Sequence, residues 1–330
     1  MGVGAAIAAV AMALPERRVS NQQIAARLGV DADWITRRTG TRERPWAAAD
    51  ERLSRLAADA GLGALELAEV EPHELDLVLV ATSTADEITP NAGPLVAGLI
   101  GADRAGALDV GAACTGWLSA LSLACGQIES SRARHALVVG ADFLSRFLDE
   151  SDRDTAPLFA DGAGAAVVSA TDSEEERVGP VVLRADHSGS DLIRLARGEH
   201  IQMNGSETFR AGVSSLVEVT IEALAASDCR LQDIDLFVYH QANSRIIKAV
   251  GERLNLPPER VVDYVDRFAN ASTATLPIAL TVARSEGRIR AHDRVLLAAF
   301  GGGLTWGATV VQWSPRASEP ASARRRLSRA

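Results

Sequence analysis

Apolar runs with the length of strands alternate with alanine-rich stretches of helical length along most of the chain. Two of the clearest runs are LDLVLVATS at 75–83 and HALVVGA at 135–141, which are apolar at nearly every position. Such runs are typical of strands buried on both faces, and their alternation with helical stretches is typical of α/β proteins. The pattern therefore predicts an α/β fold with buried sheets.

Segments of the two halves of the chain match at one constant offset, the one that carries position 75 to position 234. LDLVLVATS at 75–83 resembles IDLFVYHQA at 234–242, and at the same offset HALVVGA falls on RVLLAAF at 294–300. The Ala-Leu of WLSALSL (117–123) falls likewise on that of LPIALTV (276–282). Each match between such apolar segments is weak by itself, but the three share one register. We therefore expect two halves with the same topology.

The domain boundaries follow from this register. The acidic, turn-prone segment TDSEEERVG (171–179) separates the halves, which we place at 1–172 and 173–316. The polar and basic ASARRRLSRA segment belongs to a tail, 317–330, which we expect to be disordered.

The N-terminal run MGVGAAIAAVAMAL (1–14) is apolar like a signal peptide, but no basic region precedes it. It leads into a segment in which Ser20 or Asn21 can cap a short helix that Gly29 ends. We therefore expect a first core strand here. No stretch elsewhere reaches the roughly 18 apolar residues that a membrane helix needs, so we expect no membrane segment.

Composition narrows the function. The 330 residues, 47% of them hydrophobic, are enough for a large core, and 34 basic against 43 acidic residues give a net charge of −9. This balance argues against nucleic-acid binding as the main activity. The three cysteines, Cys114, Cys125 and Cys229, are odd in number and widely spaced, which favours a reducing cytoplasm and gives no metal-binding spacing.

Cys114 lies in DVGAACTGW (109–117), where a predicted strand joins a predicted helix. The N–H groups and dipole of a helix N-terminus would favour the thiolate and make this residue a candidate nucleophile. A single cysteine among small residues is also compatible with a small buried hydrophobe.

His240 and Asn270 lie at comparable junctions in the second half, in YHQAN (239–243) and FANASTATLPIAL (268–280). Alone, they are compatible with a packed histidine and a turn residue. Together with Cys114 they fit a site in which a thiolate carries an acyl group and two neutral donors hold a second thioester. The glycine-rich DGAGA (161–165) lacks the spacing of a dinucleotide loop, and we expect it to serve close packing of a strand and a helix.

Six motifs in sequence order carry a family resemblance. They are WITRRTGTRER (34–44), AACTGW (112–117), FADGAGAAV (159–167), YHQANSR (239–245), ANASTATLPIAL (269–280) and FGGGLTWG (300–307). From about Gly4 to Trp313 the chain resembles the β-ketoacyl-acyl carrier protein synthase III family of thiolase-fold condensing enzymes. The resemblance implies a thiolase-like duplicated α/β fold with five αβαβα layers and two pseudo-symmetric halves.

The resemblance also implies a two-stage acyl transfer without a cofactor or a metal. Cys114 would take an acyl group from acyl-CoA, with its own N–H and that of Gly303 as the oxyanion hole. His240 and Asn270 would then hold the thioester of malonyl-acyl carrier protein while carbon dioxide leaves. The glycines at 301–303 are also compatible with a tight turn that serves only the backbone.

Further residues are assigned to substrate binding by the same resemblance. Those expected to bind CoA or pantetheine are Trp34, Arg38, Thr39, Arg153, Met203, Phe209 and Asn243. Those expected to dock the acidic carrier protein are Arg210, Arg245 and Arg253, with Glu252 at a position where several relatives are basic. A cytoplasmic homodimer is implied as well.

Three departures from the family bear on acyl-chain choice, at Thr89, Thr115 and Trp117. Two other functions stay open at this point. One is a related acyltransferase that hands the acyl group from Cys114 to an oxygen or nitrogen nucleophile of a specialised metabolite. The other is a non-catalytic scaffold of the same fold.

Overall fold

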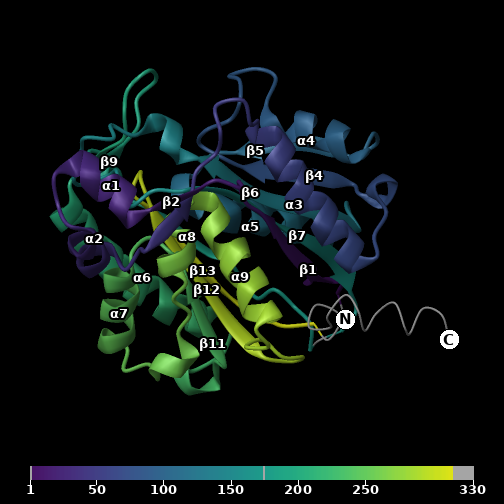
Figure 1. Ribbon diagram of the computed structural model, residues 1–330. Coiled ribbons are helices and arrows are strands. Elements are labelled where there is room, and N and C mark those ends of the chain that lie inside the picture. The colour runs from purple at the N-terminus through teal and green to yellow at the C-terminus, as the bar shows by residue number, and fades with distance from the viewer. Residues whose placement is uncertain (1, 174, 315–330) are drawn as a thin grey trace.

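The computed structural model describes residues 2–173 and 175–314, so the predicted tail at 317–330 lies outside the described residues. The described residues form two large sheets and two two-stranded ones, with helices between the large sheets and on both of their outer faces, as Figure 1 shows. The predicted α/β class is confirmed.

The first sheet uses the N-terminal half of the chain. Its order is β1 (Gly4–Ala13), β7 (Asp161–Thr171), β6 (His135–Phe143), β4 (Leu77–Ala81) and β5 (Gly106–Val110). Strand β4 runs parallel to both β5 and β6, whereas β7 pairs antiparallel with β6 and β1. The apolar run at 1–14 therefore enters the sheet as a core strand, as predicted.

The second sheet uses the C-terminal half. Its order is β11 (Leu236–Tyr239), β12 (Arg294–Gly301), β13 (Thr305–Gln312) and β8 (Val182–Ala185). Strands β11 and β12 are parallel, and β13 is antiparallel to both of its neighbours. The predicted boundary between 172 and 173 falls between the two sheets and stays a prediction.

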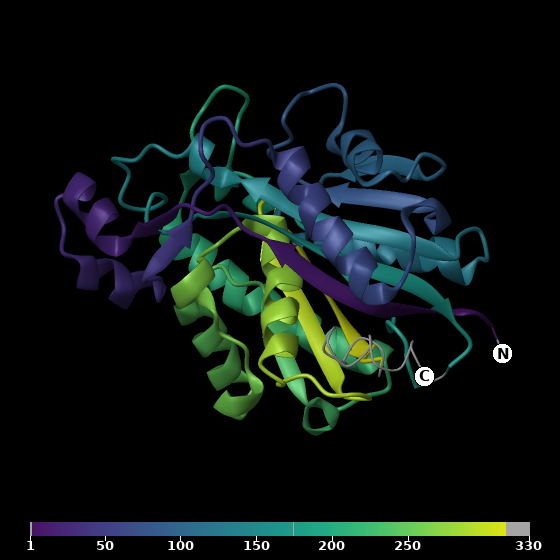
Figure 2. The same ribbon diagram turned by 45° about the vertical axis from the view of Figure 1, so that its right-hand side comes forward.

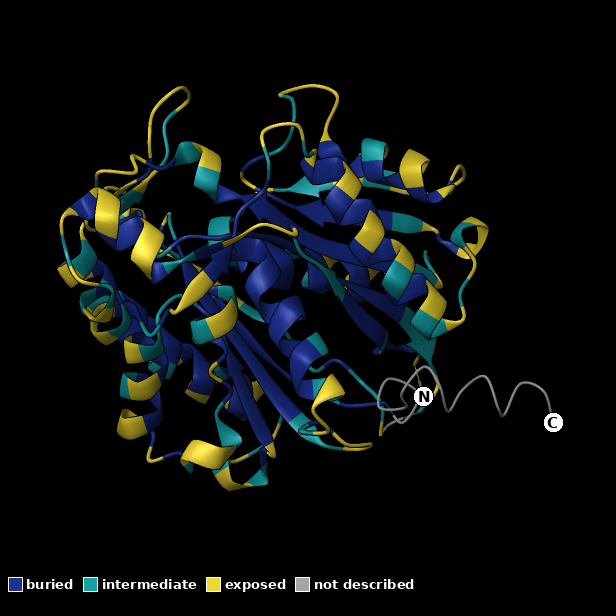
Figure 3. Cartoon of the chain, viewed as in Figure 1, coloured by how far each residue is buried: buried dark blue, intermediate teal, exposed yellow. Residues whose placement is uncertain are grey.

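Helices complete five layers. The helices α5 (Gly116–Glu129) and α9 (Thr275–Ser285) lie between the sheets, where they share the central core with strands of both halves. The first sheet is covered outside by α3 (Leu53–Ala68) and α4 (Ala92–Ile100), and the second by α6 (Gly205–Ala226) and α7 (Ser244–Arg253). Figure 3 shows the buried strands and central helices and the exposed outer faces of the outer helices. This arrangement is the expected αβαβα fold.

The constant offset between the halves holds in the strand pairing. Leu77 of β4 pairs with Ala136 of β6, and the two positions equivalent to them, Leu236 of β11 and Val295 of β12, pair in the second sheet. The helices α5 and α9 start at equivalent positions too, each after a short 3-10 helix, η2 (Ala113–Thr115) or η7 (Ser272–Ala274). The two halves therefore bring equivalent loops to the same edge of their sheets.

Two local predictions are confirmed. Helix α1 (Asn21–Leu28) is capped by Ser20 and ends at Gly29, whose φ of 63° suits glycine. The DGAGA segment opens β7, and a Cβ added at Gly164 would lie 2.8 Å from Cγ of Pro277 on α9. These glycines therefore let a strand and a helix approach closely, as expected.

Smaller elements complete the fold. They are β2 (Arg18–Ser20), α2 (Ala32–Thr39), β3 (Glu43–Pro45), α8 (Val265–Phe268) and the hairpin of β9 (Ile193–Arg194) and β10 (Gln202–Met203). The view in Figure 2 shows α1 and α2 as a lobe beside the two sheets. The remaining 3-10 helices are η1 (Pro72–Glu74), η3 (Leu144–Phe147), η4 (His187–Gly189), η5 (Leu231–Asp233) and η6 (Pro258–Arg260). Within the described ranges, every helix is too short or too polar to cross a bilayer.

Candidate active site

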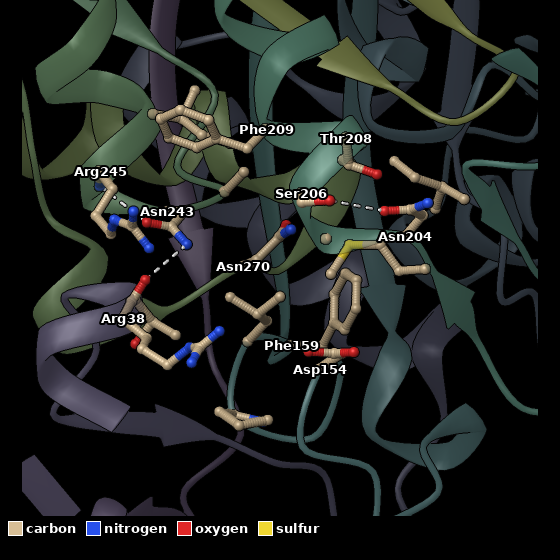
Figure 4. Close-up of a pocket in the computed structure, with 18 of the residues that line it drawn as sticks. Arg38, Asp154, Phe159, Asn204, Ser206, Thr208, Phe209, Asn243, Arg245 and Asn270 are labelled. Carbon is tan, nitrogen blue, oxygen red and sulfur yellow. Dashed lines mark hydrogen bonds between the residues drawn. The ribbon is translucent and has the colours of Figure 1, made fainter. Parts of the chain in front are cut away.

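A cavity of about 910 Å³ lies where loops of both halves meet. Figure 4 shows part of its lining, which comes from segments far apart in the sequence. Twelve predicted site residues line it: Trp34, Arg38, Thr39, Cys114, Arg153, Met203, Phe209, Arg210, His240, Asn243, Arg245 and Asn270. The structure therefore brings the three candidate catalytic residues and most of the candidate binding residues into one site.

Cys114 lies on the short helix η2, between β5 and α5. The preceding Ala113 has a φ of 44°, a left-handed value that is costly for a residue with a side chain. The turn after β12 approaches Cys114 from the other half, and a Cβ added at Gly301 would lie 2.8 Å from the Cys114 nitrogen. Only a glycine at position 301 leaves room for the loop that carries Cys114.

A serine hydroxyl lies beside the Cys114 thiol. Ser272 Oγ lies 3.5 Å from Sγ, and it donates the hydrogen bond. Burial, with a smaller contribution from the charge of Asp142, raises the pKa of the thiol to about 11. The prediction that the helix N-terminus favours the thiolate here is wrong for the free protein, because burial outweighs a dipole effect of typically about 0.3–1 kcal/mol.

His240 follows strand β11, and its backbone N–H bonds to the Ala298 carbonyl at 2.8 Å. The residue is 3% exposed, and burial lowers the pKa of the ring to about 3. Its Nδ1 lies 2.5 Å from Oγ1 of Thr275, at the start of α9. The imidazole is therefore neutral near pH 7 and offers one donor and one acceptor.

Asn270 is held by its backbone and by one side of its amide. Its backbone N–H bonds to Leu158 O at 3.0 Å, its carbonyl accepts from Ala160 N at 2.9 Å, and Oδ1 accepts from Ser272 N at 2.9 Å. The side-chain NH₂ has no partner among the described residues and belongs to the cavity lining (Figure 4). Asn270 is therefore an oriented, neutral hydrogen-bond donor.

The outer part of the cavity is aromatic and cationic. The Arg38 guanidinium lies 4.8 Å from the ring centre of Trp34, and that of Arg245 lies 5.5 Å from the ring centre of Phe209. Asn243 links the two groups, because Nδ2 donates to Arg38 O at 3.2 Å and Oδ1 accepts from Arg245 N at 2.8 Å (Figure 4). Such a mouth suits a long substrate with an aromatic base and phosphates.

Comparison with known proteins decides the family. The family model described as 3-Oxoacyl-[acyl-carrier-protein (ACP)] synthase III matches residues 108–187, and the model of its C-terminal part matches 224–313. The β-ketoacyl-[acyl-carrier-protein] synthase III of Sphingopyxis alaskensis is 43% identical over 308 residues, which cover 91% of this chain and 96% of that protein. The chain belongs to the β-ketoacyl-[acyl-carrier-protein] synthase III family.

Solved structures agree with this assignment. The synthase III of Aquifex aeolicus VF5 is 36% identical, with a TM-score of 0.91 over 94% of this chain and 100% of that one. The enzyme of Thermus thermophilus is 42% identical, with a TM-score of 0.89 over 94% and 99%. The priming β-ketosynthase of the R1128 polyketide pathway is 33% identical, with a TM-score of 0.90 over 94% and 96%.

Two residues assigned to the site lie outside the cavity lining of this synthase III fold. Arg253 is exposed at the end of α7. Gly303 has a φ of 134° and lies in the turn after β12, two residues beyond the close contact between Gly301 and Cys114. Glu252, noted for its departure from relatives, lies 3.8 Å from Lys248 Nζ. Position 253 therefore belongs to the outer surface rather than to the substrate cavity.

Several assigned residues use their polar groups within the protein. Arg153 donates to the Leu28 carbonyl at 3.0 and 3.2 Å, and the Thr39 hydroxyl donates to the Ile35 carbonyl at 2.8 Å. Thr115 and Trp117, two of the family departures, are buried and absent from the cavity lining. The Thr115 hydroxyl bonds to Ala112 O and to Thr305 Oγ1, so it ties the cysteine loop to the FGGG turn.

Two side chains that support the site from beneath were missed by reasoning from the sequence. Arg44 and Trp46 donate to the carbonyls of Pro157 and Phe159 at 3.1 and 3.0 Å, on the segment whose other groups hold Asn270. Arg44 is fully buried, and burial lowers its pKa to about 10. WITRRTGTRER contains Arg44, but no local signal shows that its guanidinium lies beneath the site.

Buried Asp142 supports the site from the first half. Its carboxylate accepts hydrogen bonds from Thr82, Ser83, Thr84 and Thr273, the last at 2.8 Å from the hydroxyl. Burial raises its pKa. The carboxylate thereby joins the end of β6 to the loop that carries Asn270.

Proposed function

We propose that the protein catalyses a decarboxylative Claisen condensation that joins an acyl group from acyl-CoA to malonyl-acyl carrier protein. One observation carries this proposal: a half-buried cysteine, a neutral histidine and an oriented asparagine amide line one cavity. The family assignment gives the reaction class, and the roles of the individual residues are our proposal.

In the first stage, Cys114 Sγ attacks the carbonyl carbon of the acyl-CoA thioester. The new bond to Sγ gives a tetrahedral intermediate, whose collapse breaks the bond to the CoA sulfur, and CoA leaves with the proton that the thiol gives up. The oxyanion of the tetrahedral intermediate is held by two backbone N–H groups. One is that of Cys114, and the other is that of Gly303 in the turn at 300–303. Loss of one such donor typically costs about 3–4 kcal/mol.

In the second stage, malonyl-acyl carrier protein takes the place of CoA. Its carboxylate leaves as carbon dioxide, and the electron pair moves towards the thioester oxygen. His240 and Asn270 donate hydrogen bonds to that oxygen and stabilise the enolate. The enolate carbon then attacks the acyl group, and Cys114 leaves as a thiolate that takes up a proton from solvent.

The outer cavity suits the long arm shared by CoA and the carrier protein. Trp34 and Arg38 present an aromatic face and a guanidinium plane to the adenine. Asn243 is placed for a pantetheine amide. The arm is surrounded by four further lining residues, Arg153, Thr39, Met203 and Phe209. Arg210 and Arg245 at the mouth, with Arg253 on the surface, give the acidic carrier protein a cationic docking face.

One experiment tests the reaction in two steps. The protein is incubated with acyl-CoA, and the adduct is located on Cys114 by mass spectrometry, with Cys114→Ser as the control. Malonyl-acyl carrier protein is then added, and a β-ketoacyl product is expected. No adduct would contradict both enzymatic functions; an adduct that malonyl-carrier protein fails to discharge would favour transfer to an oxygen or nitrogen nucleophile.

A homodimer is part of the proposal, and the edge strand β5 supports it. This strand has one neighbour in the first sheet, and Leu108 on it is 44% exposed, while Ile88 is 74% exposed. An exposed strand edge with apolar side chains favours pairing with a second copy. Leu108→Lys is expected to shift the mass in light scattering from dimer to monomer; a wild-type monomer would contradict the proposal.

A cytoplasmic location is proposed on chemical grounds. The three cysteines are free thiols, and the proposed mechanism needs Cys114 reduced. Detection of the protein in the cytoplasmic fraction of its source cells would support this location.

A further inference from the structure

The two ring nitrogens of His240 have different surroundings. Nδ1 lies 2.5 Å from the Thr275 hydroxyl, whereas Nε2 has no hydrogen-bond partner among the described residues, and the residue lines the cavity. A neutral imidazole carries one N–H, and the partner of one nitrogen decides which nitrogen holds the proton. The role of His240 therefore depends on what Thr275 does.

The Thr275 hydroxyl has one proton and two possible acceptors, His240 Nδ1 at 2.5 Å and the Ser272 carbonyl at 3.0 Å. If the hydroxyl donates to Ser272, Nδ1 must carry the ring proton and Nε2 presents a bare lone pair to the cavity. If it donates to Nδ1, Nε2 carries the proton and becomes a donor. The two states have opposite effects on a developing oxyanion.

Two observations favour donation to His240. The Ser272 carbonyl already accepts the backbone N–H of Thr275, so it does not need the hydroxyl proton. The contact with Nδ1 is also the shorter of the two. Both side chains are buried, at 3% exposure each, and threonine is stiff about its first side-chain bond, so packing maintains this geometry.

We propose that Thr275 is a positioning residue that donates its hydroxyl proton to Nδ1 of His240 and thereby holds the Nε2–H tautomer towards the cavity. The histidine N–H then joins the Asn270 amide as a second donor to the malonyl thioester oxygen. This inference rests on the proposed function for its catalytic meaning, but the tautomer itself is a property of the free protein.

The tautomer is measured first, without substrate. Protein labelled with ¹⁵N-histidine is studied by NMR near pH 7, and the His240 signals are assigned from their loss in His240→Gln. We expect a protonated Nε2 and an unprotonated, hydrogen-bonded Nδ1. A protonated Nδ1 would overturn the inference even if the condensation reaction proceeds, so its failure is distinguishable from failure of the proposed function.

Variants of Thr275 test the consequence. Thr275→Val removes the hydroxyl, and we expect the ratio of the malonyl decarboxylation rate to the Cys114 acylation rate to fall at least about tenfold. Thr275→Ser should restore the ratio to within about threefold. Thr281→Val on the same helix is the matched control, because the Thr281 hydroxyl bonds to Pro277 O, within the helix.

The outcomes separate a positioning role from a structural one. A Thr275→Val protein that keeps the wild-type ratio would overturn the inference, as would a ratio that Thr275→Ser fails to restore. If Thr275→Val does not fold, the tautomer of the wild-type protein and that of Thr275→Ser still decide the question.

Discussion

At the scale of single residues, burial rather than a neighbouring charge sets the protonation of the proposed catalytic groups. Burial brings the pKa of Cys114 to about 11 and that of His240 to about 3, so both are neutral near pH 7. A neutral His240 and the Asn270 amide can stabilise an oxyanion without carrying an unpaired charge into the core. We therefore expect the thiol to lose its proton during acylation rather than before it.

The reactivity of Cys114 is expected to rise with pH across the physiological range. A raised pKa leaves the thiol protonated well above pH 7, so the thiolate fraction grows about tenfold per pH unit up to the pKa. We expect the iodoacetamide alkylation rate of Cys114, followed by mass spectrometry, to increase from pH 7 to pH 10. A plateau below pH 9 would contradict this expectation; Cys114→Ser gives the background rate.

Gly301 is a second residue on which we expect the reaction to depend, because it has no side chain. Gly301→Ala would place a Cβ 2.8 Å from the Cys114 nitrogen, so the cysteine loop must move away from the oxyanion site. We expect acylation by acyl-CoA to slow by about 100-fold, the loss typical of one misplaced oxyanion donor.

The control for this prediction is the neighbouring glycine. The nearest atom to a Cβ at Gly302 is the Ile193 carbonyl oxygen, at 3.3 Å, and no Cys114 atom is among its nearest contacts. Gly302→Ala should therefore be the milder variant in the same stopped-flow acylation assay, and equal losses in both would refute a specific role for position 301.

At the scale of elements, the segment 157–160 connects β3 and the Trp46 that follows it to the site. The side chains of Arg44 and Trp46 donate hydrogen bonds to its carbonyls at 157 and 159. Its carbonyl at 158 and its N–H at 160 form hydrogen bonds with the backbone of Asn270. Asn270 is thereby positioned by residues near the other end of the chain.

Trp46→Phe tests this connection, because it removes the hydrogen bond to Phe159 and keeps an aromatic ring. We expect the free energy of unfolding to fall by about 1–3 kcal/mol and the turnover number to fall several-fold at a temperature where the variant is folded. The measurements are chemical denaturation and steady-state kinetics.

Trp313→Phe is the matched control. Trp313 is also fully buried, but its Nε1 has no hydrogen-bond partner in the described part of the chain. This variant should lose stability through packing alone and keep its turnover number. Equal turnover in both variants would show that the contact with Phe159 does not position Asn270.

At the scale of the whole molecule, the net charge of −9 contrasts with the cationic mouth of the cavity. On the proposed function, we expect an acidic carrier protein to be repelled by most of the surface and attracted by Arg210, Arg245 and Arg253, which favours docking in one orientation. In the proposed reaction the carrier arm enters the cavity that Cys114 of one half lines together with His240 and Asn270 of the other.

Charge reversal at the docking face tests this picture. Arg253→Glu lies outside the cavity lining, so we expect KM for malonyl-acyl carrier protein to rise about threefold to tenfold and KM for acyl-CoA to change much less. The effect should shrink at high ionic strength, because salt screens exposed charges. Arg290→Glu, an exposed arginine outside this face, is the control, and equal effects of both variants would contradict the docking role.

Much of this protein was determined by the sequence alone. The apolar runs predicted an α/β fold, and the constant offset between them matches the pairing of β4 with β6 and of β11 with β12. Ser20 and Gly29 marked the ends of α1, and the motifs named Cys114, His240 and Asn270. Such features depend on periodicity and on local backbone chemistry, which a sequence displays directly.

Tertiary structure alone decided the rest. The high pKa of Cys114, the support of Asn270 through Arg44 and Trp46, the clearance at Gly301 and the contact between Thr275 and His240 all depend on burial and on atoms distant in sequence. The helix N-terminus at Cys114 is visible in the sequence, but the burial that outweighs it is not. Desolvation and close contact arise only when both halves of the chain are packed around the cavity.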